Sequence, residues 1–239
     1  MCTIAVLVGV TDLPLVIAAN RDELYARPTR APERLARDLV GGVDGLSGGT
    51  WLALHRRGVF AAVTNQRVMT PPLGQVKSRG LVVKELALAA DQDAYVAALD
   101  PRAYASMNLV WGDADRVSVA YLRHEGGKEV IALPQGIHVL TNDRLGSPEF
   151  PRARHIADAI AAAPRDWPAL APALATILAD HTHFEVPRRE LSATCIHTPV
   201  YGTRSSTLAA LDRGRVVHYL HADGPPCTTP YADRGGLLA

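Results

Sequence analysis

Apolar and polar positions in the first twenty residues predict a β-hairpin. Thr3–Val10 is a continuous apolar and β-branched run, which is typical of a buried strand. Thr11–Pro14 is typical of a turn, because proline presets φ and Asp12 can hydrogen bond to its own backbone. Leu15–Asn20 is again apolar and predicts the paired strand.

The remaining apolar periodicities predict further strands and helices in separate blocks. Strands are expected at residues 51–55, 59–64, 108–112, 117–123, 129–133, 137–141, 194–197, 206–212 and 216–221. Helices are expected at residues 79–90 and 93–99, from Ser147 or Glu149 towards 162, and in a stretch that ends at 179. Pro172 predicts a kink or two short helices in that last stretch. Residues 27–38 are expected to form a loop, and residues 41–44 and 47–50 are expected to bracket a turn.

The order of these elements is strands, helices, strands, helices, strands. Short turns between consecutive strands favour antiparallel sheets over βαβ units. We therefore predict an α+β fold in which two largely antiparallel sheets pack face to face between outer helices, a four-layer αββα sandwich. One domain is expected over residues 1–239, with a Gly- and Pro-rich tail attached loosely from about residue 222.

Composition and charge narrow the classes of function. The net charge of +1 gives no electrostatic basis for binding nucleic acid. No apolar run is long enough to span a bilayer, and the start of the chain lacks the pattern of a signal peptide. The three cysteines, at positions 2, 195 and 227, form no disulfide framework, so we expect a reducing, cytoplasmic location. The expected partner is a small-molecule or lipid-like ligand, and no oligomeric state is predicted.

Cys2 is the first candidate for chemistry. If Met1 is removed, the Cys2 thiol and a free α-amine lie on one residue, and the amine can accept the thiol proton near neutral pH. This pairing is a nucleophile with its own base. The alternative interpretation is that Cys2 is only a small residue at the start of a strand. A tight hairpin would bring Asn20 and Asp22 close to the Cys2 amine, with Arg21 on the opposite strand face.

Motifs spread along the chain resemble those of the NRDE family, also called the transport and Golgi organisation protein 2 family. They follow the family's order from residue 2 to about residue 221. The motifs are Met1-Cys2-Thr3, Ala19-Asn20-Arg21-Asp22-Glu23, Gly48-Gly49-Thr50-Trp51, Thr64-Asn65, Ser78-Arg79-Gly80, Asn108-Leu109-Val110, His138-Val139-Leu140-Thr141-Asn142 and Tyr201-Gly202-Thr203-Arg204-Ser205-Ser206. The resemblance implies the N-terminal nucleophile hydrolase fold, an αββα sandwich, and roles in handling haem, lipid or acyl-CoA metabolites.

A more distant similarity to cysteine amidases of the choloylglycine hydrolase type implies roles for individual residues. The implied catalytic residues are Cys2, Asp22, Asn142 and Arg204, and the implied substrate-binding residues are Asn20, Arg21 and Asn65. The amidase arginine that precedes the asparagine is replaced here by Ala19. Arg21 alternates with its neighbours along the strand, so we expect that it does not take over that role.

The similarity implies a mechanism and a geometry. The Cys2 thiolate attacks a carbonyl carbon, and the amides of Asn142 and Asn65 donate to the oxyanion. Asp22 holds the α-ammonium, and Arg204 favours the thiolate. The resulting activity is hydrolysis of a small linear amide or thioester through an acyl-enzyme, with no cofactor required. We expect Cys2, Asp22, Asn142 and Arg204 to converge in a cleft at one end of the sandwich, with Asn20 and Asn65 lining the same space.

The alternative function is a non-catalytic carrier of an apolar metabolite, such as haem, acyl-CoA or a lipid, on the same fold. His181-x-His183 and His218-x-x-His221 leave haem ligation open, since haem needs one axial side chain. No carboxylate or cysteine lies at ligand spacing from these histidines, so no metal site is predicted. Cys195 is expected to be a buried structural thiol, and Cys227 in the tail is expected to be incidental.

Overall fold

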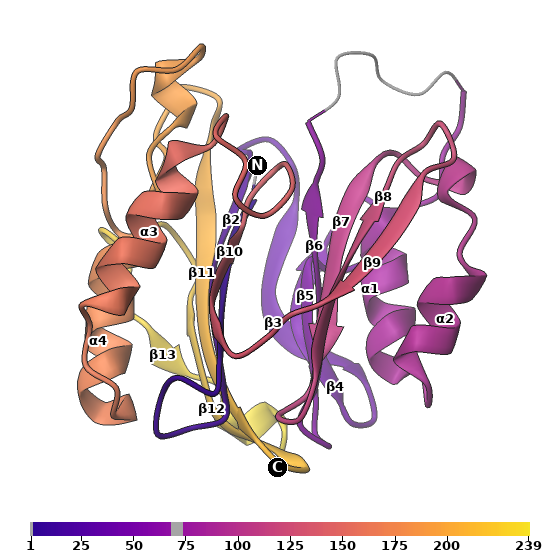
Figure 1. Ribbon diagram of the computed structural model, residues 1–239, viewed down its shortest axis with the longest axis horizontal. Coiled ribbons are helices and arrows are strands. Elements are labelled where there is room, and N and C mark those ends of the chain that lie inside the picture. The colour runs from indigo at the N-terminus through magenta and orange to yellow at the C-terminus, as the bar shows by residue number, and fades with distance from the viewer. Residues whose placement is uncertain (1, 68–73) are drawn as a thin grey trace.

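The chain forms four layers in the order helices, sheet, sheet, helices, which confirms the predicted αββα sandwich (Figure 1). The computed structural model describes residues 2–67 and 74–239. Named strands in this part of the chain pair only in the antiparallel direction. Met1 lies outside the described residues, so its removal stays a prediction.

Sheet A is the six-stranded sheet that contains the start of the chain. Its strands, in spatial order, are β10 (Gly136–Leu140), β1 (Cys2–Val8), β2 (Leu15–Leu24), β11 (Tyr201–Asp212), β12 (Arg215–Ala222) and β13 (Ala232–Asp233). Sheet B has seven strands in the described residues. They are β3 (Thr29–Ala36), β4 (Leu39–Asp44), β5 (Leu52–His55), β6 (Val59–Asn65), β7 (Met107–Gly112), β8 (Val117–Leu122) and β9 (Lys128–Ala132).

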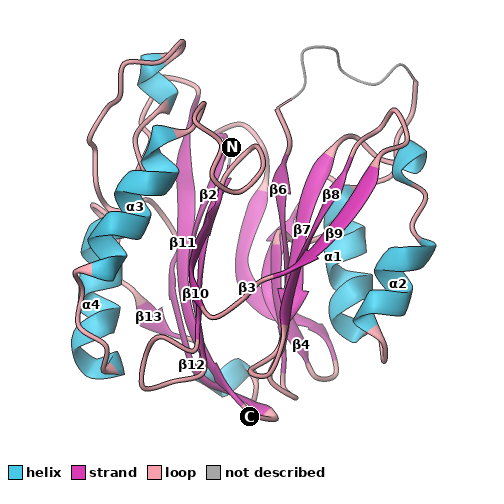
Figure 2. Cartoon of the chain, viewed as in Figure 1, coloured by secondary structure: helices cyan, strands magenta, loops and turns pink. Residues whose placement is uncertain are grey.

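Two pairs of helices cover the outer faces of the sheets (Figure 2). The helices are α1 (Arg79–Leu88) and α2 (Gln92–Ala98) on sheet B, and α3 (Pro151–Ala161) and α4 (Trp167–Leu178) on sheet A. Short 3₁₀ turns lie at Pro101–Ala103, Arg189–Leu191 and Gly235–Leu237. Within the described residues, no helix combines the length and the apolar character needed to cross a membrane.

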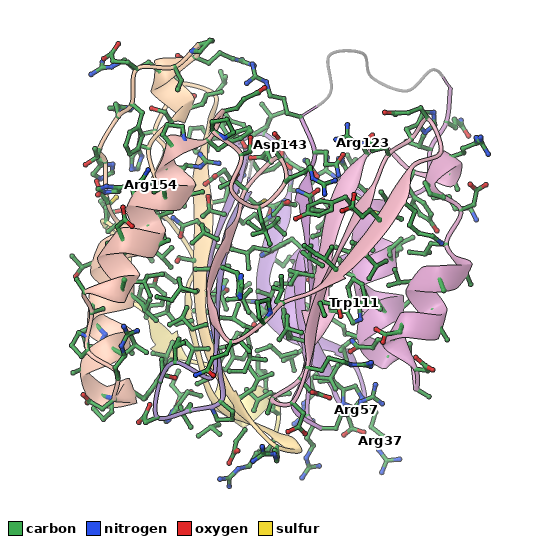
Figure 3. All side chains as sticks on the ribbon, viewed as in Figure 1. Arg37, Arg57, Trp111, Arg123, Asp143 and Arg154 are labelled. Atoms are coloured by element: carbon green, nitrogen blue, oxygen red, sulfur yellow. The ribbon has the colours of Figure 1, made fainter. Side chains whose placement is uncertain are left out.

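Side-chain alternation along β1 separates the two faces of sheet A. Ile4 and Val6 belong to the core between the sheets, whereas Ala5 belongs to the core under α3 and α4. Cys2 shares the face of Ile4 and Val6, because residues two apart in a strand point the same way. Side chains fill the space between the two sheets (Figure 3). The predicted hairpin of β1 and β2 therefore places Cys2 at one end of the inter-sheet core.

Two segments that the sequence assigned to loops or turns are strands of sheet B. The expected loop at 27–38 contains β3, an edge strand with a register shift between Arg30 and Glu33. Pro32 is tolerated there because an irregular edge strand does not need every N–H group. Residues 41–44, which were expected to flank a turn, belong to β4, and the turn follows this strand. Gly42 is needed for packing, since a Cβ atom there would lie 2.2 Å from the Trp51 ring.

Helix α4 is continuous where the sequence predicted a kink or two pieces. Pro172 lies inside the helix, and both Pro172 and Pro168 are exposed. The Pro168 carbonyl, which loses its helical N–H partner, therefore lies at a surface that water can reach. Asp166 supports the start of the helix, because its side chain accepts from Ala169 N at 3.2 Å. The expected strand at 194–197 is also absent, and only an isolated bridge is present there.

The C-terminal segment from residue 222 is held by several contacts. β13 pairs with β12, and Tyr231 Oη lies 2.6 Å from Ser206 Oγ. Leu237 and Leu238 pack against the core between the sheets. These contacts do not match the expectation of a loosely attached tail. Their residues are irregularly spaced, so no periodic pattern in the sequence indicates them.

Two glycine motifs in the sequence meet in space. The backbone of Gly49 packs on that of Gly80, and Thr50 N donates to Gly80 O at 3.0 Å. A Cβ atom at Gly49 would lie 2.4 Å from the Gly80 carbonyl carbon, which is closer than any normal contact. This contact holds the start of α1, and hence Arg79, against the connection between β4 and β5.

We expect the Gly49→Ala substitution to lower the free energy of unfolding by about 1–3 kcal/mol, because the new methyl group overlaps backbone atoms that cannot rotate away. Urea denaturation of both proteins measures this difference. Gly236→Ala is the matched control, since among the described residues no heavy atom lies within 4 Å of a Cβ atom there. Equal stability of the two variants would contradict this account of the contact.

Candidate active site around Cys2

Cys2 is the first residue of β1 and is half-buried. Its cross-strand partner on β2 is Arg21. Burial raises the pKa of the Cys2 thiol above its ordinary value, and the Asp22 carboxylate raises it further. The positive charge of Arg21 acts in the opposite direction. Ionisation of this thiol therefore depends on a balance between burial and the Asp22 carboxylate on one side, and neighbouring positive charge and the Asp22 backbone on the other.

Asp22 lies beside Cys2, as the sequence predicts. Its carboxylate is buried, and Thr203 Oγ1 donates to Oδ1 at 2.7 Å. Burial raises the pKa of Asp22, while the positive charge of Arg152 and the Thr203 hydrogen bond lower it. Tyr201 Oη also donates to the Asp22 backbone carbonyl at 2.8 Å. The end of β2 is thus fixed next to the start of β1.

Arg21 lies on the same strand face as Cys2, which corrects the expectation that it points away from the site. The sequence argument correctly set Arg21 on the face opposite Asn20 and Asp22. Residues two apart share a face, however, so Arg21 and Ala19 point to the same side of the sheet. Ala19 and Arg21, the cross-strand partner of Cys2, both face the space between the sheets. In the cysteine amidases an arginine stands at the position of Ala19. Arg21 therefore supplies a guanidinium close to the place where that arginine is missing.

The guanidinium of Arg21 is held in place from two sides. Its central carbon lies 4.3 Å from the centroid of the Trp51 ring, a cation–π contact. Nη1 donates to Thr29 Oγ1 at 3.0 Å. Burial lowers the pKa of Arg21, and the negative charges of Cys2 and Glu23 raise it again. A buried guanidinium with few acceptors of its own is suited to stabilise negative charge at the neighbouring sulfur.

Two further arginines interact electrostatically with Cys2, and the sequence analysis assigned a role to neither. Burial lowers the pKa of both Arg152 and Arg79, and the negative charge of Cys2 raises both. Arg152 is fully buried, and its Nη1 donates to the carbonyls of Leu191 at 3.0 Å and Ala193 at 3.3 Å. The sequence pattern could have indicated that Arg152 is buried, because it shares the apolar face of α3 with buried alanine and isoleucine side chains.

Buried amides join the two sheets at the end where Cys2 lies. Asn108 of β7 donates from Nδ2 to the carbonyls of Thr141 at 3.3 Å and Asp143 at 3.1 Å, just beyond β10. Asn142 lies between these two residues and donates from Nδ2 to Asn65 O at 2.7 Å, at the end of β6. Sheet B therefore fixes the loop of sheet A that carries Asn142. Asn108 belongs to a motif noted in the sequence, but no role was predicted for it.

A cleft of about 680 Å³ opens at this end of the sandwich. Asn65, Asn142 and Arg152 line its polar part, and Asn142 Oδ1 accepts from Arg152 Nη2 at 3.3 Å. Its rim is largely apolar and includes Leu24, Val186, Pro187, Leu191, Pro199 and Val200. Cys2 is not among the described residues that line the cleft. The structure thus brings Asn65 and Asn142 into the cleft as expected, with Arg152 connecting it to Cys2 electrostatically.

Two predicted site residues lie elsewhere. Arg204 sits at a register shift of β11, and its Nη1 donates to the carbonyls of Leu24, Tyr25 and Arg27 at 2.9, 3.0 and 3.2 Å. These bonds stabilise the turn after β2, and the positive charge of Arg204 acts on Arg21. Asn20 Nδ2 donates to the carbonyls that end α4 and precede β11, at 2.8 and 3.0 Å, and does not line the cleft. Of the residues expected in the cleft, Asn65 and Asn142 line it, whereas Cys2, Asp22, Arg204 and Asn20 do not.

The histidines that left haem ligation open do not come together. Their described partners differ: Arg189 O for His183, the Trp167 ring for His218 and Thr207 Oγ1 for His221. Burial lowers the pKa of His221 to about 4, so its imidazole is neutral at pH 7. Haem binding stays a prediction from the resemblance alone.

Comparison of the sequence with known proteins gives a family match over most of the chain. A family model described as "Transport and Golgi organisation 2" matches residues 1–223. The "Transport and Golgi organization protein 2 homolog" of Bos taurus is 29% identical over 230 residues, covering 83% of this chain and 82% of that protein. The homolog of Homo sapiens is 28% identical over 232 residues, with the same shares covered.

Comparison with solved structures supports the fold. A "Caenorhabditis elegans N-acylethanolamine-hydrolyzing acid amidase (NAAA) ortholog" superposes with a TM-score of 0.54 at 12% identity, covering 87% of this chain and 92% of that chain. A variant of conjugated bile acid hydrolase from Clostridium perfringens superposes with a TM-score of 0.57 at 12% identity, covering 100% and 94%. At this identity the likeness establishes a shared αββα fold and nothing about activity.

The geometry predicts which arginine controls the Cys2 thiol. Removing the charge in Arg21→Gln raises the thiol pKa, so the thiolate fraction at pH 7 falls and the curve of labelling rate against pH moves to higher pH. We expect Cys2 to react several-fold more slowly with iodoacetamide, because a smaller fraction of the thiol is ionised. Mass spectrometry of the N-terminal peptide measures the rate at Cys2 alone. Arg21→Lys keeps the positive charge, so this variant should retain most of the wild-type labelling rate at Cys2.

Arg204→Gln is the matched control, because Arg204 bonds to backbone carbonyls of the turn after β2. Its effect on the Cys2 rate is expected to stay within about twofold, since a charge held away from the sulfur is screened by solvent. An equal slowing by Arg204→Gln and Arg21→Gln would mean that the geometric assignment is incorrect.

Proposed function

This chain belongs to the Transport and Golgi organisation 2 family, and from that premise we propose that it is an N-terminal cysteine hydrolase of a small linear amide or thioester. The observation that carries the proposal is the position of Cys2. It starts β1, an interior strand of sheet A, on the face towards sheet B, with a guanidinium and a buried carboxylate beside it. Aminopeptidase removal of Met1 would give this cysteine the free α-amine that its activation requires.

The first half of the proposed reaction forms an acyl-enzyme. The α-amine of Cys2 takes the thiol proton, and the sulfur bonds to the substrate carbonyl carbon. The tetrahedral intermediate collapses as the bond from carbon to nitrogen or sulfur breaks. The proton on the α-ammonium passes to the leaving amine or thiol. Asp22, buried beside the start of β1, is the group that stabilises the transient α-ammonium.

The second half releases the acyl group. Water attacks the carbonyl carbon of the thioester, and the α-amine accepts a proton from that water. The bond from carbon to sulfur breaks, a carboxylic acid leaves, and the sulfur recovers its proton. Arg21 supports both halves, because its positive charge favours the thiolate that attacks and the thiolate that leaves. No metal or organic cofactor takes part in this sequence of steps.

Two asparagines are the proposed donors to the oxyanion. Asn142 Nδ2 carries two hydrogens, and its recorded bond to Asn65 O uses one of them. The other is available to a substrate oxygen in the cleft. The Asn65 side chain also lines the cleft, and none of the recorded hydrogen bonds in the described residues uses its side-chain amide. Donors that need no rearrangement are effective at stabilising charge that develops during the reaction.

The apolar rim of the cleft favours an acyl substrate. Leu24 and Val200 are exposed by 49% and 65%, which is unusual for large apolar side chains next to a polar site. A linear acyl chain would cover them while its carbonyl reaches the asparagines. The same rim supports the second candidate function, a carrier that binds an acyl or other lipid-like ligand without turnover. We propose the cytoplasm as the location, because a reactive Cys2 needs a reducing compartment.

We expect Cys2→Ala to lower hydrolysis of a short-chain acyl thioester by about 10³-fold or more, because no other group can form the acyl-enzyme. Release of free thiol from the substrate measures the rate, with the Met1-free wild-type protein as reference. Unchanged thermal unfolding of the variant shows that the fold is intact. A wild-type protein that binds the thioester but never cleaves it would favour the carrier function.

A pair of asparagine variants separates catalysis from folding. Asn65→Ala is expected to lower kcat by about 10²-fold at nearly constant stability, because it removes an oxyanion donor that stabilises no other described residue. Asn20→Ala is the matched control. It removes two buried hydrogen bonds to carbonyls outside the cleft, so stability should fall by about 1–3 kcal/mol while kcat stays near its wild-type value. The reverse pattern would exclude the proposed oxyanion site.

A further inference from the structure

Four potential metal ligands from three segments of the chain meet near the end of α4. His181 follows α4, Cys195 and His197 precede β11, and Cys227 follows β12. Their nitrogen and sulfur ligand atoms all lie within 4.8 Å of one another. Cys195 is buried, Cys227 is partly buried, and both histidines are exposed. The site is separate from the cleft and from Cys2.

Three of these atoms already have the spacing of a zinc site. Cys195 Sγ lies 3.6 Å from Cys227 Sγ and 3.5 Å from His197 Nε2, and His197 Nε2 lies 3.2 Å from Cys227 Sγ. Tetrahedral zinc with Zn–S bonds of about 2.3 Å and Zn–N bonds of about 2.0 Å requires edges of about 3.8 Å between sulfurs and about 3.5 Å between sulfur and nitrogen. The three atoms therefore form one face of a tetrahedron of suitable size.

His181 can supply the fourth ligand. Its Nδ1 lies 3.1 Å from the Cys195 carbonyl oxygen, which fixes the proton on Nδ1 and leaves the lone pair on Nε2. Its ring centroid lies 5.2 Å from that of His197, with the planes tilted by 44°. The ligand atoms of the cluster lie up to 4.8 Å apart, which exceeds the tetrahedral edges of about 3.5–3.8 Å. This exposed ring must therefore move by about 1 Å to close the tetrahedron around an ion.

We propose that His181, Cys195, His197 and Cys227 bind one Zn²⁺ ion in a closed structural site. Each thiol loses its proton to solvent and forms a bond from sulfur to zinc, and each neutral imidazole donates a nitrogen lone pair. Two thiolates balance the charge of the divalent cation, so the occupied site carries no net charge. Two sulfur and two nitrogen ligands in a tetrahedron are typical of zinc and exclude magnesium or calcium.

The ion connects the C-terminal tail to one wall of the cleft. Ser192 and Thr198 line the cleft and flank Cys195 and His197 in the same segment. Zinc therefore stabilises this wall through Cys227 of the tail. The inference does not depend on the proposed hydrolysis, because it concerns four other side chains.

Sequence spacing could not reveal this site. Cys195 and His197 are close in sequence, but His181 lies 14 residues before Cys195 and Cys227 lies 30 residues after His197. Neither interval is one of the short intervals that mark zinc sites. Of the four histidines in the two histidine pairs of the sequence, only His181 belongs to the cluster.

Zinc binding by the full-length protein tests the proposal. The protein is purified with reductant, and any bound metal is removed with a chelator. It is then dialysed against Zn²⁺, and its zinc content is measured by inductively coupled plasma mass spectrometry. About one zinc per chain is expected, with affinity at least tenfold lower in Cys227→Ser. His183→Gln is the matched control, because His183 lies two residues from His181 and contacts Arg189 O. It should bind zinc as the wild type does.

A second measurement needs no variant. Co²⁺ in place of zinc should give the visible bands of a tetrahedral site and absorption from charge transfer between sulfur and metal. Zn²⁺ should slow alkylation of Cys195 and Cys227 at least tenfold, while Cys2 reacts as before. No metal uptake by the reduced protein, full uptake by Cys227→Ser, or a Cys195–Cys227 disulfide as the resting state would each overturn the proposal.

Discussion

Hydrogen bonds from two buried asparagines connect the ends of the two sheets, and the candidate active site depends on them. Asn108 of sheet B bonds to the loop after β10, and Asn142 in that loop bonds back to the end of β6. Each of these amides is buried, so each unmet hydrogen bond would cost about 1–3 kcal/mol. Apolar packing alone would leave the spacing of the sheets adjustable. The polar connection fixes it beside Cys2, where a reaction would need fixed donors.

The electrostatics of Cys2 follow from competition between opposing effects. Burial and the Asp22 carboxylate disfavour the thiolate, whereas neighbouring positive charge, including the guanidinium groups of Arg21, Arg79 and Arg152, favours it. Arg21 shows how position can matter more than motif. It lies two residues after Ala19, so the strand presents its charge on the same face, and the Trp51 ring supports it there.

Most of the architecture could be predicted from the sequence, because strand and helix periodicities report which faces are buried. The hairpin that carries Cys2 and the αββα order follow from such patterns. β3 was missed because an irregular edge strand has few buried positions. The placements of Arg204 and Asn20 could not be predicted, because they depend on a register shift in β11 and on the carbonyls at the end of α4. Arg152 and Cys227 act only through contacts between distant segments, which no local pattern encodes.

The central claim is that Cys2, freed of Met1, carries the acyl group during turnover. Intact-mass spectrometry of the purified protein, before and after rapid quenching with excess acyl thioester, tests it most directly. The account predicts a starting mass lower by one methionine residue, then a gain of one acyl group, which fragmentation assigns to the N-terminal cysteine. Retention of Met1 in every molecule, or acylation only at another residue, would contradict it.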